Sequence, residues 1–424
     1  MSSRQRASLD SLCSLIADCP HSTPVWTESG FLVIRNQNIK NGKLDLSERS
    51  YTDLEHYLIR VKRAKPQVGD LIVTREAPMG DVCMVPEGLE CCVGQRQVLL
   101  RPNPEKVVPR FLLYAIQSPE VQHEISWSEG TGSTVSNVRI PVLKNIKIPV
   151  FPLKIQEEIS TLLGALDDRI ALLRETNATL EAIAQALFKS WFVDFDPVHA
   201  KQQGIAPEGL DEATAALFPE GFEESELGLV PKGWSYVSLK EVVSIFDSKR
   251  IPLAGQDREK RHGQYPYYGA AALMDYVDDY LFDGVFLLTG EDGSVADAQG
   301  YPITQYVWGK IWVNNHAHVL QGKNGVSTEH LMLSLKRTNI QPFITGAVQA
   351  KLSQSNMWRI KFMNPPQYVS ESFGALLDPL YTQVRHNSEQ AETLATLRDT
   401  LLPRLISGQL RLPEAEKMIE ETSV

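Results

Sequence analysis

An Asn-Pro-Pro motif is the most suggestive arrangement of reactive residue types in the chain. It occupies residues 364–366. Enzymes that methylate exocyclic amines use such a turn, followed by an aromatic residue, to hold an extruded base. Here Gln367 stands in the aromatic position, and Tyr368 lies one residue late. No glycine-rich stretch suited to a methyl donor lies at a sensible distance upstream. The residues therefore favour a structural role for the two prolines, ahead of a helix.

A second group of side chains has the chemistry to read or hold DNA. Arg and Lys suit guanine, Asn and Gln suit adenine, and Ser, Thr and basic groups suit phosphates. In residues 1–150 we single out Arg35, Gln37, Lys40, Arg75, Gln95, Arg96, Gln97, Ser133, Thr134 and Asn137. In residues 233–365 we single out Lys249, Arg250, Arg258, Lys260, Arg261, Tyr267, Tyr268, Asn314, Asn315, His316, Gln349 and Lys351. A solvated surface position, or a core position for the tyrosines, is the alternative for each residue, so the clusters matter more than their members.

The cluster Gln95-Arg96-Gln97 carries a geometric condition. If these residues form a strand, successive side chains point to opposite faces, and only one set can face DNA. The pair His316 and His318 would by the same rule point the same way and suggest a metal site. Without a cysteine or third histidine at a suitable spacing, we expect no metal on this chain. The five cysteines form no C-x-x-C pair, which argues against a zinc knuckle or a disulfide framework.

Bulk properties describe an ordinary globular chain. Its 424 residues suffice for two or three domains. No apolar run reaches membrane-spanning length and the N-terminus has no signal-peptide core, so we expect a cytoplasmic protein. The formal charge of −10 is spread unevenly, because two near-neutral blocks with many arginines (1–150 and 233–365) alternate with two acidic ones. Only the near-neutral blocks suit contact with phosphates.

The chain contains an internal repeat. Residues 129–173 align without a gap on residues 343–387 at an offset of 214, with glycine and proline positions in common. Further upstream, VGDLIVTRE resembles DGVFLLTGE, and VGQRQVLL resembles VNNHAHVL. An offset of about half the chain indicates a duplicated unit. In each copy, short strand-like runs with Pro and Gly breaks are followed by a long helical pattern.

Each helical pattern shows a heptad repeat. The first has Leu or Ile every seven residues from Ile159 to Leu187, and the second has a similar row from Phe373 to Leu401. One asparagine interrupts each seam, Asn177 in the first and Asn387 in the second. Antiparallel pairing that places these two side chains opposite each other aligns the remaining apolar layers. We therefore predict an antiparallel coiled coil whose register is set by this polar layer.

Two further points concern the predicted helix pair. Arg398 falls opposite Leu166, where we expect its side chain to lie along the seam and reach solvent. The alternative to the pair is that each helix simply packs within its own domain.

The expected fold is α+β, with two mixed α/β target-recognition domains separated by two long antiparallel helices and related by pseudo-two-fold symmetry. The expected segments are a first domain (1–150), a central helix (151–195), a connector (196–232), a second domain (233–365), a C-terminal helix (366–412) and a tail (413–424). Two similar domains at a fixed separation suit double-stranded DNA, whose equivalent grooves recur about every 34 Å.

Over nearly its whole length, the sequence resembles the specificity subunit of type I restriction–modification enzymes. The matching pieces are DCPHSTPVWTESGFLVIRNQNIKNG, IPVFPLKIQEEI with its long helix, FKSWFVDFDPVHAKQQG, GLVPKGW, YPYYGAAAL, FLLTGEDGSV and TLLPRLISGQL. The resemblance implies recognition of a bipartite DNA site, one half per domain, with a spacer set by the helices. It also implies two modification subunits as partners and, in the full complex, restriction subunits.

The resemblance further implies that this chain is not catalytic and carries no cofactor. S-adenosylmethionine would bind the modification partner, and ATP with Mg²⁺ the restriction partner. The second helix start, FMNPPQYVSES, departs from the usual pattern. One alternative function is a partner-independent DNA-binding regulator, which the modest charge of the recognition blocks disfavours. A solitary methyltransferase fails for want of a donor-binding motif.

Overall fold

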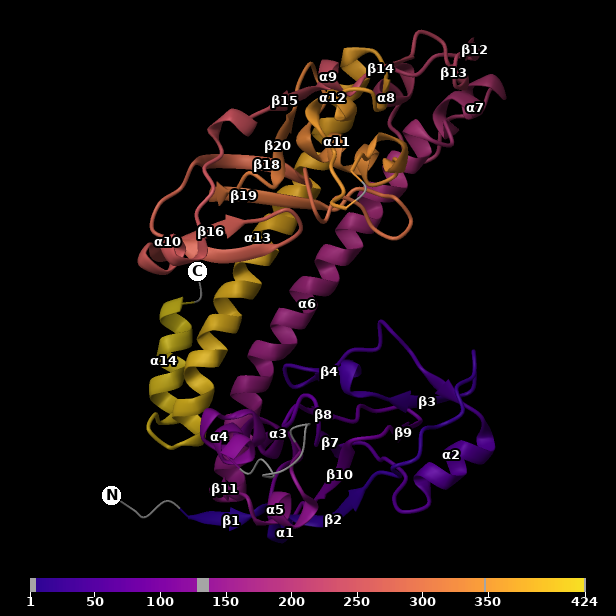
Figure 1. Ribbon diagram of the computed structural model, residues 1–424. Helices are drawn as coiled ribbons and strands as arrows, with labels where there is room; N and C mark the ends of the chain where they lie inside the picture. Colours follow the sequence, from indigo (N-terminus) through magenta and orange to yellow (C-terminus); the bar gives the residue numbers. More distant parts are fainter. Residues whose placement is uncertain (1–4, 128–136, 347, 423–424) are drawn as a thin grey trace. The chain divides into compact units, whose positions relative to one another are not determined.

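The computed structural model describes residues 5–127, 137–346 and 348–422. These residues form two compact units. The first unit contains the chain up to Leu172 and again from Gln390, and the second contains Leu173–Glu389. Each unit combines one sheet-containing domain with parts of the same two long helices (Figure 1). The fold is thus α+β, as the sequence predicts.

The first domain is built on a four-stranded antiparallel sheet in the order β2-β10-β7-β8. Its strands are β1 (Arg6–Ser8), β2 (Cys13–Asp18), β3 (Phe31–Ile34), β4 (Ile39–Lys40), β5 (Lys43–Leu44), β6 (Tyr51–Thr52), β7 (Leu71–Thr74), β8 (Val82–Met84), β9 (Cys91–Val93), β10 (Gln97–Pro102) and β11 (Lys147–Pro149). Its helices are α1 (Leu9–Leu12), η1 (Asn36–Asn38), α2 (Leu54–Val61), α3 (Pro109–Gln117), α4 (Pro119–Trp127) and α5 (Ile140–Asn145).

Both faces of this sheet are covered. On β10, Val98 and Leu100 face a core shared with α3 and the long helices, while Leu99 faces a second core that includes Ile34 and Ile72. Burial on both faces explains why β7 and β10 read as continuous apolar runs instead of alternating ones. Strand β10 begins at Gln97, so Gln95 and Arg96 lie in the preceding turn. The alternation of side chains between the two faces of a strand does not apply to them.

The second domain contains a six-stranded sheet in the order β15-β20-β18-β19-β16-β17. Its strands are β14 (Ser235–Ser238), β15 (Val243–Ile245), β16 (His262–Tyr268), β17 (Leu273–Val277), β18 (Phe282–Gly290), β19 (Thr304–Val313), β20 (Ala317–Gly322) and β21 (Lys361–Asn364). Its helices are α9 (Leu239–Val242), η2 (Asp247–Lys249), α10 (Gly255–Lys260), α11 (Thr328–Leu335), η3 (Gln341–Phe343) and α12 (Gln354–Met357). The connector between the domains forms α7 (Asp196–Gln202), α8 (Glu212–Ala216) and a hairpin of β12 (Phe222–Ser225) and β13 (Gly228–Pro231).

The two long helices are α6 (Leu153–Phe192) and α13 (Gln367–Ile406), and a last helix, α14 (Leu412–Thr422), follows them. In the first unit, Leu163 near the start of α6 shares a core with Leu401 near the end of α13. In the second unit, Trp191 near the end of α6 packs on Phe373 near the start of α13, with ring centroids 5.2 Å apart. Within each unit the two helices therefore run antiparallel. None of the helices described is long and apolar enough to cross a membrane.

Arg398 differs from expectation. Its side chain is only 18% exposed, and its Nη1 donates to Oδ1 of Asp167 on α6 at 2.6 Å. A carboxylate one residue after Leu166 thus pairs with Nη1, while Nε and Nη2 donate to Asp399, whose side chain is 65% exposed. The ion pair with Asp167 stabilises a charged residue in the seam. The heptad pattern alone did not predict this pair.

Candidate nucleic-acid interface

The Asn-Pro-Pro motif lies at a junction between two elements. Asn364 is the last residue of β21 and pairs with Ser235 of β14. The prolines then lead into α13, where the Pro366 carbonyl accepts a hydrogen bond from Val369 N at 2.9 Å. The motif thus sits where a strand passes into a helix start, the position that its counterpart Pro152 takes before α6.

In the first domain, Arg75 and Gln97 are used inside the fold. Arg75 is 7% exposed, and its Nη1 donates to Oδ1 of Asp18 at 2.8 Å. Gln97 is fully buried and accepts a hydrogen bond from Gly94 N at 3.0 Å. Asn137, half-buried, donates to Oε1 of Glu76 at 2.8 Å. These side chains brace the turns that follow β7 and precede β10.

The remaining candidates of the first domain are more accessible. Arg35, Gln37, Lys40 and Arg96 are exposed, and Gln95 is half-buried. A pocket of about 340 Å³ brings Arg35, Gln37, Gln95 and Arg96 together. Ser133 and Thr134 lie outside the described residues.

Trp26 completes this pocket, and sequence reasoning missed it. Its side chain is exposed although it is large and apolar, and the Arg35 guanidinium lies over its ring, 5.1 Å from the centroid. An exposed tryptophan near basic residues is a feature by which a search for binding residues could have found it.

The candidates of the second domain divide in the same way. Tyr267 and Asn314 are buried, which leaves them no surface toward a ligand. Arg250, Arg258, Arg261 and Tyr268 are half-buried. The exposed members are Lys249, Lys260, Asn315, His316, Gln349 and Lys351.

Several of the half-buried arginines are paired. Arg258 contacts Asp275 at 3.1 Å, and Arg261 contacts Asp278 at 2.8 Å. The Arg261 guanidinium also lies 4.8 Å from the ring centroid of Trp312. These pairings hold the guanidinium groups in place around β16 and β17.

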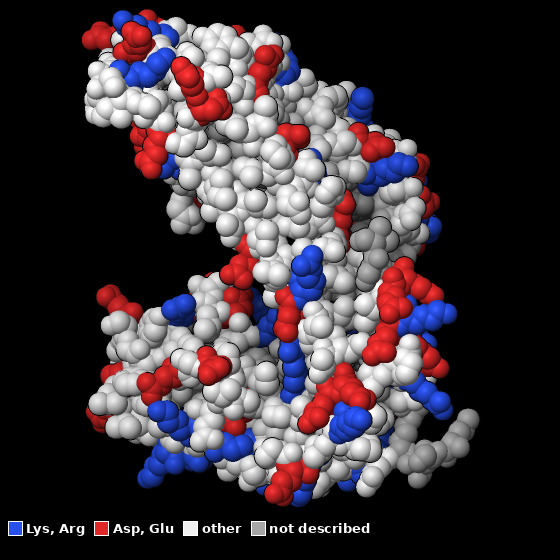
Figure 2. Space-filling model, turned by 180° about the vertical axis from the view of Figure 1, so that it is seen from behind, with Lys and Arg blue, Asp and Glu red and all other residues white. Residues whose placement is uncertain are grey.

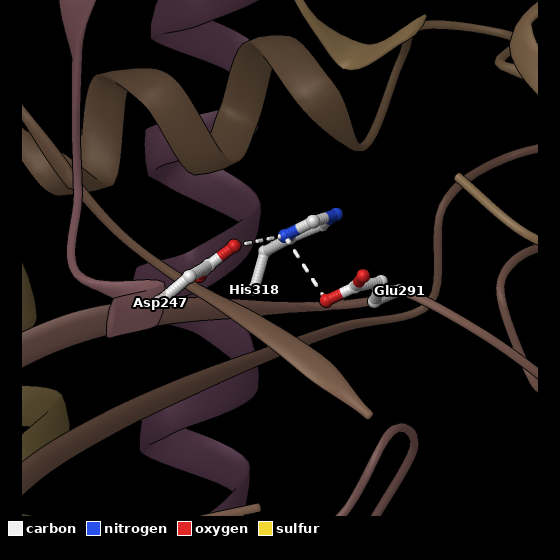
Figure 3. A group of neighbouring side chains, drawn as sticks. All are labelled: Asp247, Glu291 and His318. Carbon is white, nitrogen blue, oxygen red and sulfur yellow. Dashed lines mark hydrogen bonds and ion pairs between the residues drawn. The ribbon is translucent and has the colours of Figure 1, made fainter. Parts of the chain in front are cut away.

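A buried charge cluster lies beneath the turn of Asn315 and His316. Figure 3 shows His318 of β20 between Asp247 and Glu291, with Nδ1 2.6 Å from Asp247 Oδ2 and 3.7 Å from Glu291 Oε2. The other ring nitrogen, Nε2, donates to the Leu352 carbonyl at 2.7 Å.

Three carboxylate and imidazole ligands within 4.8 Å of one another invite comparison with a metal site. The cluster already contains a cation, because Arg250 Nη1 lies 2.8 Å from Glu291 Oε2 and its Nη2 lies 3.4 Å from Asp247 Oδ2. Burial opposes ionisation of Asp247, but hydrogen bonds from His318 and Gln354 and the charge of His318 outweigh it and lower the pKa of this carboxyl. The donor set suits an ion-pair network and leaves little room for a divalent ion.

His316 and His318 have different surroundings. β20 begins at Ala317, so strand alternation does not extend to His316, whose side chain is 48% exposed and pairs with Asp292. His318 is fully buried. The structure therefore separates the two histidines that the sequence suggested as a pair.

Backbone hydrogen bonds reveal which positions correspond in the two domains. Arg75 N donates to Arg96 O at 2.8 Å, and Glu291 N donates to His316 O at 2.8 Å. By this criterion Arg75 corresponds to Glu291, and Arg96 to His316. The second equivalence is the one that the sequence alignment of VGQRQVLL with VNNHAHVL predicts. The first corrects the alignment of VGDLIVTRE with DGVFLLTGE, which places Arg75 on Gly290, one residue too early.

A second pair of bonds gives the same correspondence. Val138 N donates to Arg75 O at 3.1 Å, and Leu352 N donates to Glu291 O at 2.8 Å. Val138 and Leu352 are separated by the 214 residues of the sequence repeat. Each domain therefore contains the same two-turn arrangement at one end of its sheet.

In each domain a carboxylate contacts the exposed side chain of the turn. In the first domain, Arg96 Nε lies 3.3 Å from Glu76 Oε2. In the second domain, His316 Nδ1 contacts Asp292, which follows Glu291 as Glu76 follows Arg75. Each domain thus presents one exposed polar side chain anchored by a carboxylate.

Charge on the surface is mixed. On the face drawn in Figure 2, basic and acidic side chains are interspersed within each body. Mixed charge weakens the non-specific attraction of this face to phosphates.

The polar layer of the helix pair lies within the second unit. Asn387 Nδ2 donates to Asn177 Oδ1 at 2.8 Å. In return, Asn177 Nδ2 donates to the Val384 carbonyl and to Ser388 Oγ, both at 3.0 Å. The heptad phasing predicts this contact, and its role in fixing the register stays a prediction.

Comparison with known proteins identifies the family. The profile described as "Type I restriction modification DNA specificity domain" matches the chain twice, at residues 23–182 and 231–395. This chain belongs to the type I restriction–modification specificity family. The two matches coincide with the duplication found in the sequence, and the family prediction is confirmed.

Individual relatives agree with this assignment. A putative type I restriction enzyme specificity subunit of Haemophilus influenzae is 38% identical over 142 residues, which are 34% of this chain and 36% of that protein. The MjaIX specificity subunit of Methanocaldococcus jannaschii is 25% identical over 82% of this chain and 78% of its own length. The HindI specificity subunit of H. influenzae is 25% identical over 75% of this chain and 81% of its own length.

A solved structure supports the fold. The S subunit of a type I restriction–modification system from M. genitalium superimposes with a TM-score of 0.58 at 18% identity, covering 95% of this chain and 96% of that one. The partner-independent regulator receives no support from any of these similarities.

Proposed function

We propose that this specificity subunit recognises a bipartite DNA sequence, one half-site per domain, with a spacer set by α6 and α13. The observation that carries the proposal is the duplicated turn arrangement, in which Arg96 and His316 are held alike by Glu76 and Asp292. A repeated reader in one chain suits two half-sites. The side chains differ between the copies, which is what two different half-site sequences require.

The chain directs methylation and restriction by partner subunits and is itself non-catalytic in this proposal. Its Asn-Pro-Pro motif has a structural role, because it forms the junction between β21 and α13. A methyl donor, S-adenosylmethionine, would bind a modification subunit, and ATP with Mg²⁺ a restriction subunit.

Two modification subunits fit the duplication. An internal repeat presents two similar helix starts, at Leu153 of α6 and Gln367 of α13. Equivalent surfaces suit equivalent partners, so the repeat supports a stoichiometry of two. Restriction subunits would join this complex in the complete enzyme.

The test is a genome-wide map of N6-methyladenine in the source strain with and without this gene. Loss of methylation at one gapped, two-part motif on deletion supports the proposal and reads out the recognised sequence. An unchanged map in cells whose modification subunit is active contradicts it. Binding of the isolated chain to a specific site at high affinity would instead favour a partner-independent DNA-binding protein.

A further inference from the structure

Arg96 has an unusual backbone for its residue type. Its φ is +65°, in the left-handed region that side chains other than glycine seldom adopt. The Arg96 carbonyl accepts a hydrogen bond from Arg75 N, and Nε lies 3.3 Å from Glu76 Oε2. These bonds hold a conformation that costs free energy on its own, and such conformations concentrate at functional sites.

Its side chain is 56% exposed at the edge of the pocket that contains Trp26, Arg35 and Gln95. Glu76 engages Nε, so the two terminal amino groups of the guanidinium are the donors that this contact does not use. They form a fork of N–H donors whose spacing matches two acceptors on one base. The pocket therefore has an anchored fork and an exposed aromatic ring side by side.

We propose that Arg96 reads a guanine in the first half-site and that His316 reads the base pair at the corresponding position in the second. The inference rests on the proposed function and adds which side chains determine the sequence. Arginine bonding to O6 and N7 of guanine is the commonest specific contact in the major groove.

Gln95 fits the complementary base. Its amide nitrogen donates to the His21 carbonyl at 2.6 Å and to Thr23 Oγ1 at 3.0 Å. Its oxygen is then the group left to face DNA, and an acceptor suits the exocyclic amine of the cytosine paired with guanine. Arg96 and Gln95 together specify one G·C pair.

His316 has a different hydrogen-bonding capacity in the equivalent place. Asp292 engages Nδ1, which leaves only Nε2 toward DNA. A single nitrogen cannot make the two-point contact of a guanidinium fork. The corresponding position of the second half-site therefore has a different base requirement.

The experiment expresses wild-type and variant genes, with the native modification subunit, in the deletion strain and maps N6-methyladenine. For Arg96→Gln we expect the preference for guanine to fall about 10- to 100-fold at one position of the first half-site. The second half-site should be unchanged. For His316→Gln the change should fall in the second half-site alone. Arg49→Gln, which removes the same charge from an exposed position of the first domain, is the matched control and should preserve the motif.

Three results would overturn the inference. These are an unchanged motif for Arg96→Gln, a uniform loss of methylation at every site with a correctly folded protein, or a change in the wrong half-site. If Arg96→Gln abolishes methylation by unfolding the domain, Arg96→Gly decides, because glycine adopts the φ of +65° without strain and has no side-chain donor for guanine. A relaxed base at the same position supports the inference, and an unaltered motif refutes it. Failure of the wild-type gene to restore any two-part motif would instead refute the proposed function.

Discussion

Arg75 and Glu291 occupy equivalent positions but carry opposite charges. In the first domain, Arg75 pairs with Asp18 at 2.8 Å. In the second domain, the carboxylate of Glu291 lies near that of Asp247, and Arg250 contacts both, at 2.8 Å and 3.4 Å. A buried carboxylate pair is costly unless cations accompany it. Divergence of a duplicated chain has thus changed several residues together while keeping a guanidinium beside the carboxylates under each turn.

Another buried histidine provides a prediction at the same scale. His330 of α11 is buried beside aromatic rings, including Phe192 with ring centroids 4.5 Å apart. Burial lowers the pKa of His330 from 6.5 to about 3. The unfolded chain therefore binds a proton below pH 6.5 that the folded chain excludes, and folding stability falls as pH drops through this window by about 1.4 kcal/mol per pH unit.

We expect His330→Phe to remove this dependence. Wild-type protein should lose about 2 kcal/mol more stability than the variant between pH 7.5 and pH 5. Urea unfolding measures this difference in the free energy of unfolding. Hydrogen exchange of the α11 amides then measures it locally. His262→Phe, at an exposed position of the same domain, should retain the wild-type slope. Identical slopes for wild type and His330→Phe would contradict the assignment.

At the scale of elements, the helix pair depends on one polar layer among apolar ones. Asn387 is buried and donates to Asn177, so replacing Asn177 with leucine leaves the Asn387 amide nitrogen without this acceptor in the seam, while its oxygen keeps the bond from Gln383. A lost partner of this kind costs about 1–3 kcal/mol. Replacing both asparagines with leucine leaves no such group.

We therefore expect the cost of the double variant to be smaller than the sum of the two single costs by about 1 kcal/mol or more. A double-mutant cycle by urea unfolding measures this coupling. The double variant should also tolerate shifted helix pairing, because apolar layers alone do not distinguish registers. Additive costs would mean that the two asparagines act independently.

At the scale of the whole molecule, the duplication links the helices to the distance between half-sites. Inserting one heptad after Leu172 and one after Glu389 preserves the a and d positions of both helices. Seven residues lengthen a helix by about 10 Å, which is about three base pairs of DNA.

The expected result is a methylated motif whose spacer is longer by up to about three base pairs, with both half-sites unchanged. Mapping N6-methyladenine in cells carrying the double insertion measures it. Inserting a heptad in one helix alone is the control, and it should abolish methylation because the paired layers no longer match. A constant spacer in an active double-insertion variant would show that the helices do not set it.

The sequence alone determined the duplication, the two long helices and the facing of Asn177 and Asn387, because heptad spacing and a constant offset are properties of the linear order. It also identified the family. The tertiary structure decided which polar residues are available. Arg75, Gln97 and Asn314 have the side chains of DNA readers, yet they are buried among their own domain's groups.

Burial depends on which turns meet at the end of a sheet, and turns separated by tens of residues have no periodic signature. Glu76 beside Arg96, and Asp247 with Glu291 beside His318, come together only through strand pairing. Trp26 joins the pocket for the same reason. The local sequence pattern thus predicts the scaffold, whereas long-range contacts determine which residues face outward.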